Sequence, residues 1–292
     1  MPHFVGYRAA DVADPELGLT IPLTILYPAD EPGRLHPVGL YELDVAPDAP
    51  IRGGQWPVVL ISHGTGGSGL THRNLAHYLA RHGVAVALPE HPHNNRTDDT
   101  WAHTPQNLMA RPRHLQLTLD FLLQHPPLAP ALQPTGAVLI GHSLGGYSAL
   151  AAAGGQPWSV PREPADGSPR PIPVPPADPR VRALVLLAPA VPWFRHAGAL
   201  RGVALPVLLL AAEKDEFIPP QHVESVLRGV PDAGRVTYRV IENAGHFSFL
   251  SPFPAARTRP DFPPSQDPPG FHRAQFHEAL YPEILAFIRQ TA

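Results

Sequence analysis

The chain has 292 residues, which is enough for one large domain or two small ones with a core that needs no covalent cross-links. Its 43% hydrophobic content predicts a globular protein, and the net charge of −3 argues against a nucleic acid as the main partner. There are no cysteines, so disulfides, thiol catalysis and thiolate metal sites are excluded. Because no apolar run is long enough to span a bilayer and the first residues lack a signal-peptide pattern, we expect a cytoplasmic protein with no membrane span.

The first part of the chain predicts four strands. Residues 4–12 and 20–27 predict a hairpin-like pair at a sheet edge. We expect residues 28–56 to form a loop, because Pro, Gly and Asp recur through this stretch. The apolar runs 57–62 and 84–89 predict buried strands, and the segment between them has Leu and Ala at helical spacing.

The rest of the chain continues this alternation of strands and helices. Further strands are predicted at 137–140, 181–187, 206–212 and 236–241, and further helices at 113–123, 147–153, 220–227 and 273–290. Strands that alternate with helices predict an α/β protein in which a mostly parallel sheet of eight strands is covered by helices on both faces. Ligands of such sheets bind at the carboxyl ends of the strands.

Two proline-rich stretches, 155–180 and 252–270, interrupt this pattern. The chain has 40 prolines, and these stretches contain too few apolar residues to build a core of their own. We therefore predict a single domain, residues 1–292, with two inserts. Each insert is an ordered surface loop or a partial lid, and disorder of the first insert is the alternative.

The most informative motif is Gly-X-Ser-X-Gly, formed by Gly141, Ser143 and Gly145. It joins the apolar strand 137–140 to an alanine-rich helix, which is the arrangement of a nucleophile elbow. The glycines have a steric reason to be there, because the strand and the helix approach closely at such a turn. The helix start also favours negative charge near Ser143. The alternative is a glycine-rich turn with an inert serine.

A serine hydroxyl becomes a good nucleophile only when a base removes its proton, and a carboxylate can orient that base. In hydrolases with this elbow the chain order is serine, acid, histidine. Asp215 and His246 each follow a predicted strand, so we predict Ser143, Asp215 and His246 as the catalytic residues. The alternatives are Glu213 and Glu216 for the acid, and His222 and His272 for the base.

An oxyanion hole needs backbone N–H groups directed at the oxygen that becomes negative in the transition state. One donor should be the amide of Leu144, and the other should come from the loop after the strand 57–62. Thr65 is the candidate, because the glycines around it let the backbone approach. The alternative is a plain glycine-rich turn. A phosphate-binding loop is excluded, since no Gly-Lys-Ser/Thr sequence follows.

Histidines near residue 91 raise the question of a metal site. His91 and His93 are separated by a proline, and neither His103 nor His114 provides a third ligand at a suitable spacing, so we predict no metal. We expect residues 91–110 to line the mouth of the site instead.

Several aromatic side chains follow predicted strand ends, and core packing is the default role for each. We predict that two of them, Trp193 and Phe247, line an apolar pocket for the acyl or alcohol part of a substrate, because both lie close in sequence to the active end of the sheet.

Over about residues 57–290 these segments together resemble the α/β-hydrolase superfamily. More narrowly, the chain is similar to the predicted dienelactone hydrolases, a group close to bacterial relatives of platelet-activating-factor acetylhydrolase. The motifs that carry this similarity are Val5-Gly6-Tyr7-Arg8, Tyr27-Pro28, Ser62-His63-Gly64-Thr65-Gly66-Gly67 and Glu90-His91-Pro92-His93-Asn94-Asn95-Arg96.

The resemblance implies a carboxylic-ester hydrolase without a cofactor. It assigns the nucleophile to Ser143, the acid to Asp215, the base to His246 and the oxyanion donors to Thr65 and Leu144. Dienelactone hydrolases use a cysteine nucleophile and this chain has no cysteine, so we expect a general ester rather than a dienelactone as substrate.

The predicted function is therefore a serine esterase that forms an acyl-enzyme with small to medium apolar acyl esters. A thioesterase, a peptidase or an acyltransferase with the same triad is the first alternative, and a non-catalytic binding protein on a hydrolase scaffold is the second. The expected partner is a small-molecule ester, and the oligomeric state stays open.

Overall fold

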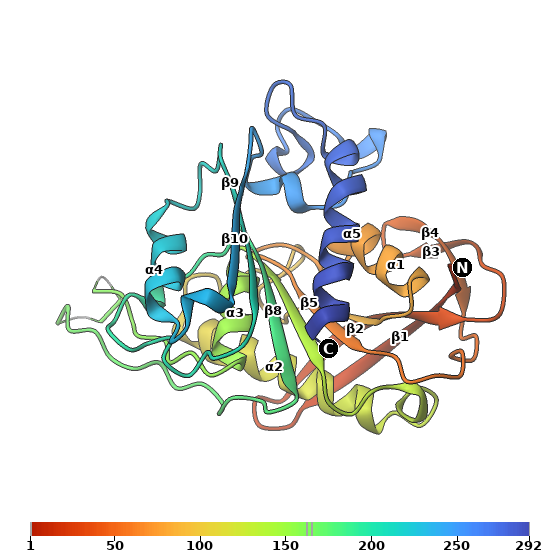
Figure 1. Ribbon diagram of the computed structural model, residues 1–292, viewed down its shortest axis with the longest axis horizontal. Coiled ribbons are helices and arrows are strands. Elements are labelled where there is room, and N and C mark those ends of the chain that lie inside the picture. Colours follow the sequence, from red (N-terminus) through yellow and green to blue (C-terminus); the bar gives the residue numbers. More distant parts are fainter. Residues whose placement is uncertain (1, 162, 165, 292) are drawn as a thin grey trace.

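The computed structural model describes residues 2–161, 163–164 and 166–291, and ten strands within this part form one sheet (Figure 1). Their order is β10-β9-β8-β7-β5-β6-β2-β1-β4-β3, and β5 to β10 are all parallel to one another. The strands are β1 (Phe4–Asp14), β2 (Leu19–Ala29), β3 (Arg34–Val38), β4 (Tyr41–Pro47), β5 (Val58–Ser62), β6 (Ala85–Pro89), β7 (Ala137–His142), β8 (Val181–Leu187), β9 (Val207–Ala212) and β10 (Val236–Ile241).

Helices cover both faces of the sheet (Figure 1). One face packs against α1 and α5, and the other packs against α2, α3 and α4. The α-helices are α1 (Arg73–Arg81), α2 (Pro105–Gln124), α3 (Leu144–Ala152), α4 (Gln221–Gly229) and α5 (Arg273–Thr291). None of the helices in the described ranges is long and apolar enough to cross a membrane. This is the α/β-hydrolase fold, as the alternation of strands and helices predicted.

The two faces of each central strand feed two separate cores. Along β5, Val58 and Leu60 pack with α2 and α3, whereas Val59 and Ile61 pack with α1 and α5. All four side chains are at most 1% exposed. Because side chains alternate along a strand, a strand buried on both faces must be apolar at every position, which explains the unbroken apolar runs in the sequence.

Two strands lie in the segment 28–56, which the sequence predicts to be a loop. β3 and β4 form a hairpin, and β4 pairs with β1 where Gly6 and Tyr7 face Ala46 and Pro47. The sheet therefore has ten strands in the described part rather than eight, and β3 takes the edge that was predicted for β1 and β2. The hairpin carries little apolar signal of its own, because one of its strands lies at the edge of the sheet and is half exposed.

The insert 252–270 projects beyond the sheet at the top of Figure 1, where two largely buried arginines attach its ends. Arg73 of α1 donates to the carbonyl of Pro252. Arg273 of α5 donates to the carbonyls of Pro264 and Gln266 at 2.8 and 2.6 Å and pairs with Asp267. This insert is thus held to the domain at both ends.

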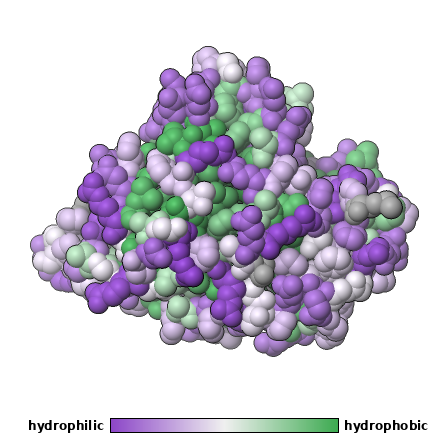
Figure 2. All heavy atoms as spheres, in the orientation of Figure 1, coloured by the Kyte–Doolittle hydropathy of each residue, from purple (hydrophilic) through white to green (hydrophobic). Residues whose placement is uncertain are grey.

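The insert 155–180 lies at another place in the fold. Within it Trp158 stacks on His196 with ring centroids 3.8 Å apart and forms an isolated bridge to Pro171, and residues 162 and 165 lie outside the described residues. In the same orientation, Figure 2 shows apolar surface over the middle of the molecule, in the region where Figure 1 draws β8, β9 and β10.

The Tyr27 hydroxyl tests how the N-terminal strands are held. It is fully buried in β2 and donates to the carbonyl of Ala49 at 2.7 Å. In Tyr27→Phe this carbonyl loses its partner, and we expect a loss of about 1–2 kcal/mol in the free energy of unfolding, measured by urea denaturation. The control Tyr238→Phe changes an exposed side chain and should change the free energy of unfolding by less than about 0.5 kcal/mol. Equal stability of the two variants would contradict the prediction.

Candidate active site

Ser143 stands at the turn between β7 and α3 with φ 54° and ψ −121°, a left-handed conformation that is rare for a residue with a side chain. Hydrogen bonds hold the backbone there. The Ser143 amide donates to Leu187 at 3.0 Å, and its carbonyl accepts from Gly146 and Ala190, both at 2.9 Å. Such strain costs roughly 1–3 kcal/mol and persists only where the surrounding structure imposes it.

The glycines of the motif have the steric role that the sequence predicted. A Cβ on Gly145 would overlap the carbonyl oxygen of Ser62 at the end of β5, and a Cβ on Gly141 would overlap the carbonyl of Gly145. Gly64 is less tightly enclosed, since its Cβ would stand 3.0 Å from the Cβ of Ser143. The absence of side chains therefore lets β5, β7 and α3 meet around the serine.

Asp215 and His246, which follow β9 and β10, are in direct contact. The Nδ1 atom of His246 lies 2.9 Å from Oδ2 of Asp215, and both side chains are 5% exposed. The other carboxylate oxygen accepts from the amides of Phe217 and Ile218 at 2.9 and 2.8 Å. The backbone thus fixes the carboxylate, and the carboxylate fixes the imidazole ring.

The alternative acids and bases lie elsewhere. Glu213 accepts from the amide of Asn243, and Glu216 lines a neighbouring cavity. His222 accepts from the amide of Val191, and His272 is exposed. Among the described residues, Asp215 is thus the carboxylate that pairs with His246.

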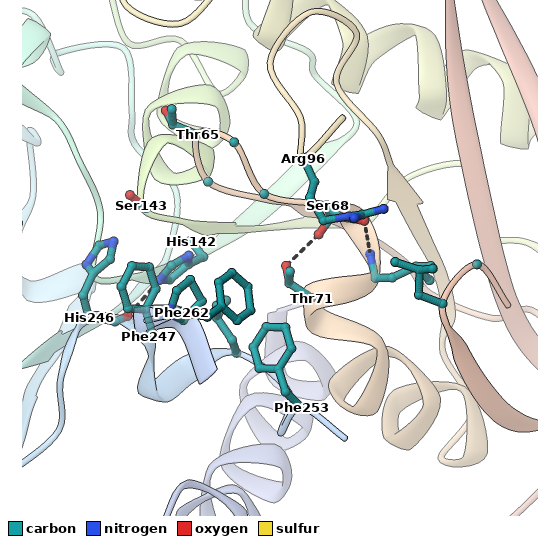
Figure 3. Close-up of a pocket in the computed structure, with 18 of the residues that line it drawn as sticks. Thr65, Ser68, Thr71, Arg96, His142, Ser143, His246, Phe247, Phe253 and Phe262 are labelled. Atoms are coloured by element: carbon teal, nitrogen blue, oxygen red, sulfur yellow. Dashed lines mark hydrogen bonds between the residues drawn. The ribbon is translucent and has the colours of Figure 1, made fainter. Parts of the chain in front are cut away.

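Ser143 and His246 lie at the same end of one cavity, with the ring turned toward the serine (Figure 3). Within the described chain, the serine hydroxyl forms no hydrogen bond with the ring. Hydrogen bonds of this kind are often long without a substrate and tighten when one binds.

The two amides predicted to bind an oxyanion, those of Thr65 and Leu144, belong to segments that flank Ser143. In the part of the chain that is described, neither amide donates a hydrogen bond to another group. Thr65 lines the same cavity as Ser143, and Leu144 is the first residue of α3. Both N–H groups are therefore available to a ligand.

The His63 ring supports the loop that carries Thr65. The amide of His91 donates to its Nε2 at 3.1 Å, so the ring proton sits on Nδ1, which donates to the carbonyl of Gly64 at 2.8 Å. That carbonyl belongs to the peptide unit whose N–H is the amide of Thr65. Burial, together with the Arg111 charge, holds the pKa of His63 well below its usual value, so the ring stays neutral.

The cavity has a volume of about 380 Å³ and is mostly apolar. Ser143 and His246 lie at one end of it, Arg96, Ser68 and Thr71 lie at the other, and aromatic rings line much of the space between them (Figure 3). The aromatic lining residues are Tyr41, Phe217, Phe247, Phe253 and Phe262. A concave, mostly apolar site with a few polar groups is the usual form of a small-molecule site.

Of the two predicted pocket residues, Phe247 lines this cavity and Trp193 does not. The ring of Trp193 packs edge-on against Tyr147 of α3, with centroids 5.0 Å apart, and its indole N–H donates to Glu163 at 3.0 Å. The segment after β8 turns toward the face of the sheet that α2 and α3 cover, whereas the cavity is lined by the turn Gly69–His72 that precedes α1. Proximity in sequence to a strand end could not distinguish these two directions.

Sequence reasoning missed most of the cavity wall. Leu40 and Tyr41 come from the unpredicted β3–β4 hairpin, and Phe253 and Phe262 come from the insert 252–270. The aromatic residues among the prolines of this insert were the only feature of the sequence that could have indicated a role in lining a cavity. Residues 91–110 were predicted to line the mouth of the site, and of these Arg96 lines the cavity. No described residue of the insert 155–180 lines it.

His142, the variable residue before the serine, was also missed. Its Nε2–H donates to the carbonyl of His246 at 2.9 Å, and the two rings lie 4.8 Å apart. Burial holds the pKa of His142 well below its usual value. The neutral ring thereby fixes the backbone of the histidine loop relative to β7.

Only two of the histidines considered for a metal site, His91 and His114, are in contact. His91 is buried, with its ring nitrogens near Ser62 at 2.8 Å and His114 at 3.1 Å. His93 pairs instead with Asp98 near the surface. Across the described ranges, no group of three or more potential ligands is arranged to hold a metal ion.

Residues 58–206 match the model of the alpha/beta hydrolase family, which covers slightly more than half of the chain. The chain therefore belongs to the alpha/beta hydrolase family, and fold and family together indicate an enzyme of the hydrolase class. No curated protein sequence gives a significant match. Among solved structures, the dienelactone hydrolase of Anabaena variabilis ATCC 29413 has a similar fold, with a TM-score of 0.53 and 19% identity over 84% of this chain and 89% of that one.

The close approach at the elbow can be tested with one methyl group. In Gly145→Ala the new Cβ must displace the Ser62 carbonyl, and we expect a loss of at least about 2 kcal/mol in the free energy of unfolding, measured by urea denaturation. The control Gly53→Ala adds a methyl group where no atom lies within 4 Å and should leave stability unchanged. A stable Gly145→Ala protein would show that α3 does not press on β5 as described.

Proposed function

We propose that this protein is a serine carboxylesterase that acts through an acyl-enzyme intermediate and that the chain works as a single catalytic domain. The observation that carries the proposal is that Ser143 and His246, which pairs with Asp215, line the same end of one largely apolar cavity. The strained backbone of Ser143 supports it further, since strain of this kind gathers at functional sites.

In the acylation step, Ser143 attacks the ester carbonyl and passes its proton to Nε2 of His246. Asp215 holds the proton on Nδ1, which leaves Nε2 free to accept, and stabilises the imidazolium that forms. The carbonyl oxygen becomes negative and accepts from the amides of Thr65 and Leu144. The C–O bond to the alcohol then breaks, and His246 returns the proton to the departing alkoxide.

Deacylation repeats these steps with water in place of the serine. A second cavity of about 570 Å³ meets the first one at His246, Phe217 and Phe247. We propose that water reaches the imidazole from this second cavity, because His246 lines it as well. Water that enters there gives its proton to His246 and attacks the acyl carbon. The bond from that carbon to Oγ of Ser143 then breaks, His246 returns the proton to Oγ, and the acid product departs.

The cavity favours an ester with an apolar acyl group of small to medium size. Its volume of about 380 Å³ has room for such a group beside the reacting carbonyl, and its walls offer mainly apolar contacts, with Arg96 on the side away from Ser143. An ester, a thioester and an amide share the same carbonyl chemistry, and a substrate panel separates these leaving groups.

Replacing the nucleophile tests the function directly. In Ser143→Ala we expect kcat for short p-nitrophenyl esters to fall by about 10⁴-fold or more and labelling by a fluorophosphonate probe to disappear. The control Ser225→Ala removes an exposed serine hydroxyl on α4 and should keep full activity and labelling. A wild-type protein that neither hydrolyses the panel nor takes the label would favour the non-catalytic binding protein.

The aromatic wall should set acyl-chain preference. Phe253 and Phe262 meet edge to face, with ring centroids 5.2 Å apart. In Phe253→Ala we expect the ratio of kcat/KM for octanoate to that for acetate esters to rise by about tenfold, because the shortened side chain enlarges the cavity. The matched change Trp193→Phe lies outside the cavity and should leave the ratio unchanged. Parallel shifts in both variants would mean that the acyl group binds elsewhere.

A further inference from the structure

Arg111 of α2 is a buried cation that the proposed chemistry does not use. Its side chain is 0% exposed, and among the described residues it forms no ion pair. Burial lowers its pKa to about 9, so the guanidinium stays charged at neutral pH. A buried charge is costly unless its donors are satisfied, so the acceptors of Arg111 indicate what it holds in place.

The acceptors of Arg111 come from three separate segments. Nε donates to the hydroxyl of Ser148 at 3.0 Å, Nη1 donates to Oδ1 of Asn94 at 2.6 Å, and Nη2 donates to the carbonyl of His63. Asn94 in turn donates to Asp99 at 2.6 Å, which connects the cation indirectly to a carboxylate. The flat guanidinium fork directs its donors rigidly, so it fixes the positions of these segments relative to one another.

Two of these segments carry the proposed oxyanion donors. The carbonyl of His63 precedes Thr65 by two residues on the loop after β5. The hydroxyl of Ser148, while accepting from Arg111, donates to the carbonyl of Leu144 at 3.1 Å. One side chain therefore connects the loop of the first donor to the helix turn of the second.

We propose that Arg111 is a positioning residue that holds the amides of Thr65 and Leu144 at the separation needed to bind one oxyanion. The inference rests on the proposed esterase function. Arg111 does not line the cavity, so it acts on the transition state through the backbone rather than on the substrate. Oxyanion stabilisation depends on donors lying about 2.7–3.1 Å from the oxygen, so a small displacement of either segment weakens it.

The test compares Arg111→Met and Arg111→Lys with Arg113→Met. Arg113 lies on the same helix and binds the fully buried carboxylate of Asp14, but it contacts neither oxyanion segment. Its replacement also removes hydrogen bonds to a buried polar group, so it controls for a general loss of stability. Active sites are counted by complete fluorophosphonate titration, and kcat and KM are then measured per titrated site. The second measurement is the affinity for a trifluoromethyl ketone, which forms a tetrahedral oxyanion on the serine.

We expect kcat per site in Arg111→Met to fall by about 10²-fold, the loss typical of one oxyanion donor, with KM within about threefold of wild type. The affinity for the trifluoromethyl ketone should fall in parallel with kcat/KM. Arg111→Lys should recover only part of this loss, since an ammonium cannot span all three acceptors. Arg113→Met should keep wild-type kcat per site.

Equal kcat per site in Arg111→Met and Arg113→Met would overturn the inference and leave Arg111 a purely structural residue. Full activity of Arg111→Lys would also overturn the inference, because a positive charge without the guanidinium geometry would then suffice for activity. A wild-type protein without hydrolytic activity contradicts the proposed function itself, and this outcome is distinct from both.

Discussion

The close approach of β5, β7 and α3 around Ser143 is the constraint on which the rest of the site depends. Three backbones meet where Gly141 and Gly145 have no room for a Cβ, and the serine between them is held at φ 54°. Burial of apolar side chains on both faces of the sheet supplies the free energy that maintains this strain. The serine side chain is directed into the cavity as a result of packing that involves the whole sheet.

Buried polar groups arrange the backbone around this turn. His142 holds the carbonyl of His246, His63 holds the peptide of Thr65, and Arg111 joins the loop after β5 to α3. Because burial keeps both of these histidines neutral, each presents one donor and one acceptor nitrogen in a fixed arrangement. Buried histidines thus hold backbone groups in place through hydrogen bonds, and only His246 takes part in the proposed proton transfer.

The cavity is built largely from parts of the chain outside the central sheet. The hairpin of β3 and β4 supplies one side, and the insert 252–270 supplies aromatic rings on another. Arg73 and Arg273 attach that insert to α1 and α5, so the wall is part of the folded domain. In this arrangement the parallel strands provide the reacting groups, and the variable segments provide the shape that selects a substrate.

The sequence by itself determined the central sheet, the elbow and the likeness to hydrolases, because these depend on local patterns: apolar runs, glycines at a tight turn and polar residues directly after strands. Only the tertiary structure decided that β3 and β4 extend the sheet, that Trp193 packs on α3 rather than in the cavity, and that Asp215 rather than Glu213 meets His246. Each of these outcomes depends on which side of the sheet a segment takes after it leaves a strand. That choice is made by contacts between residues far apart in the chain, which no local pattern encodes.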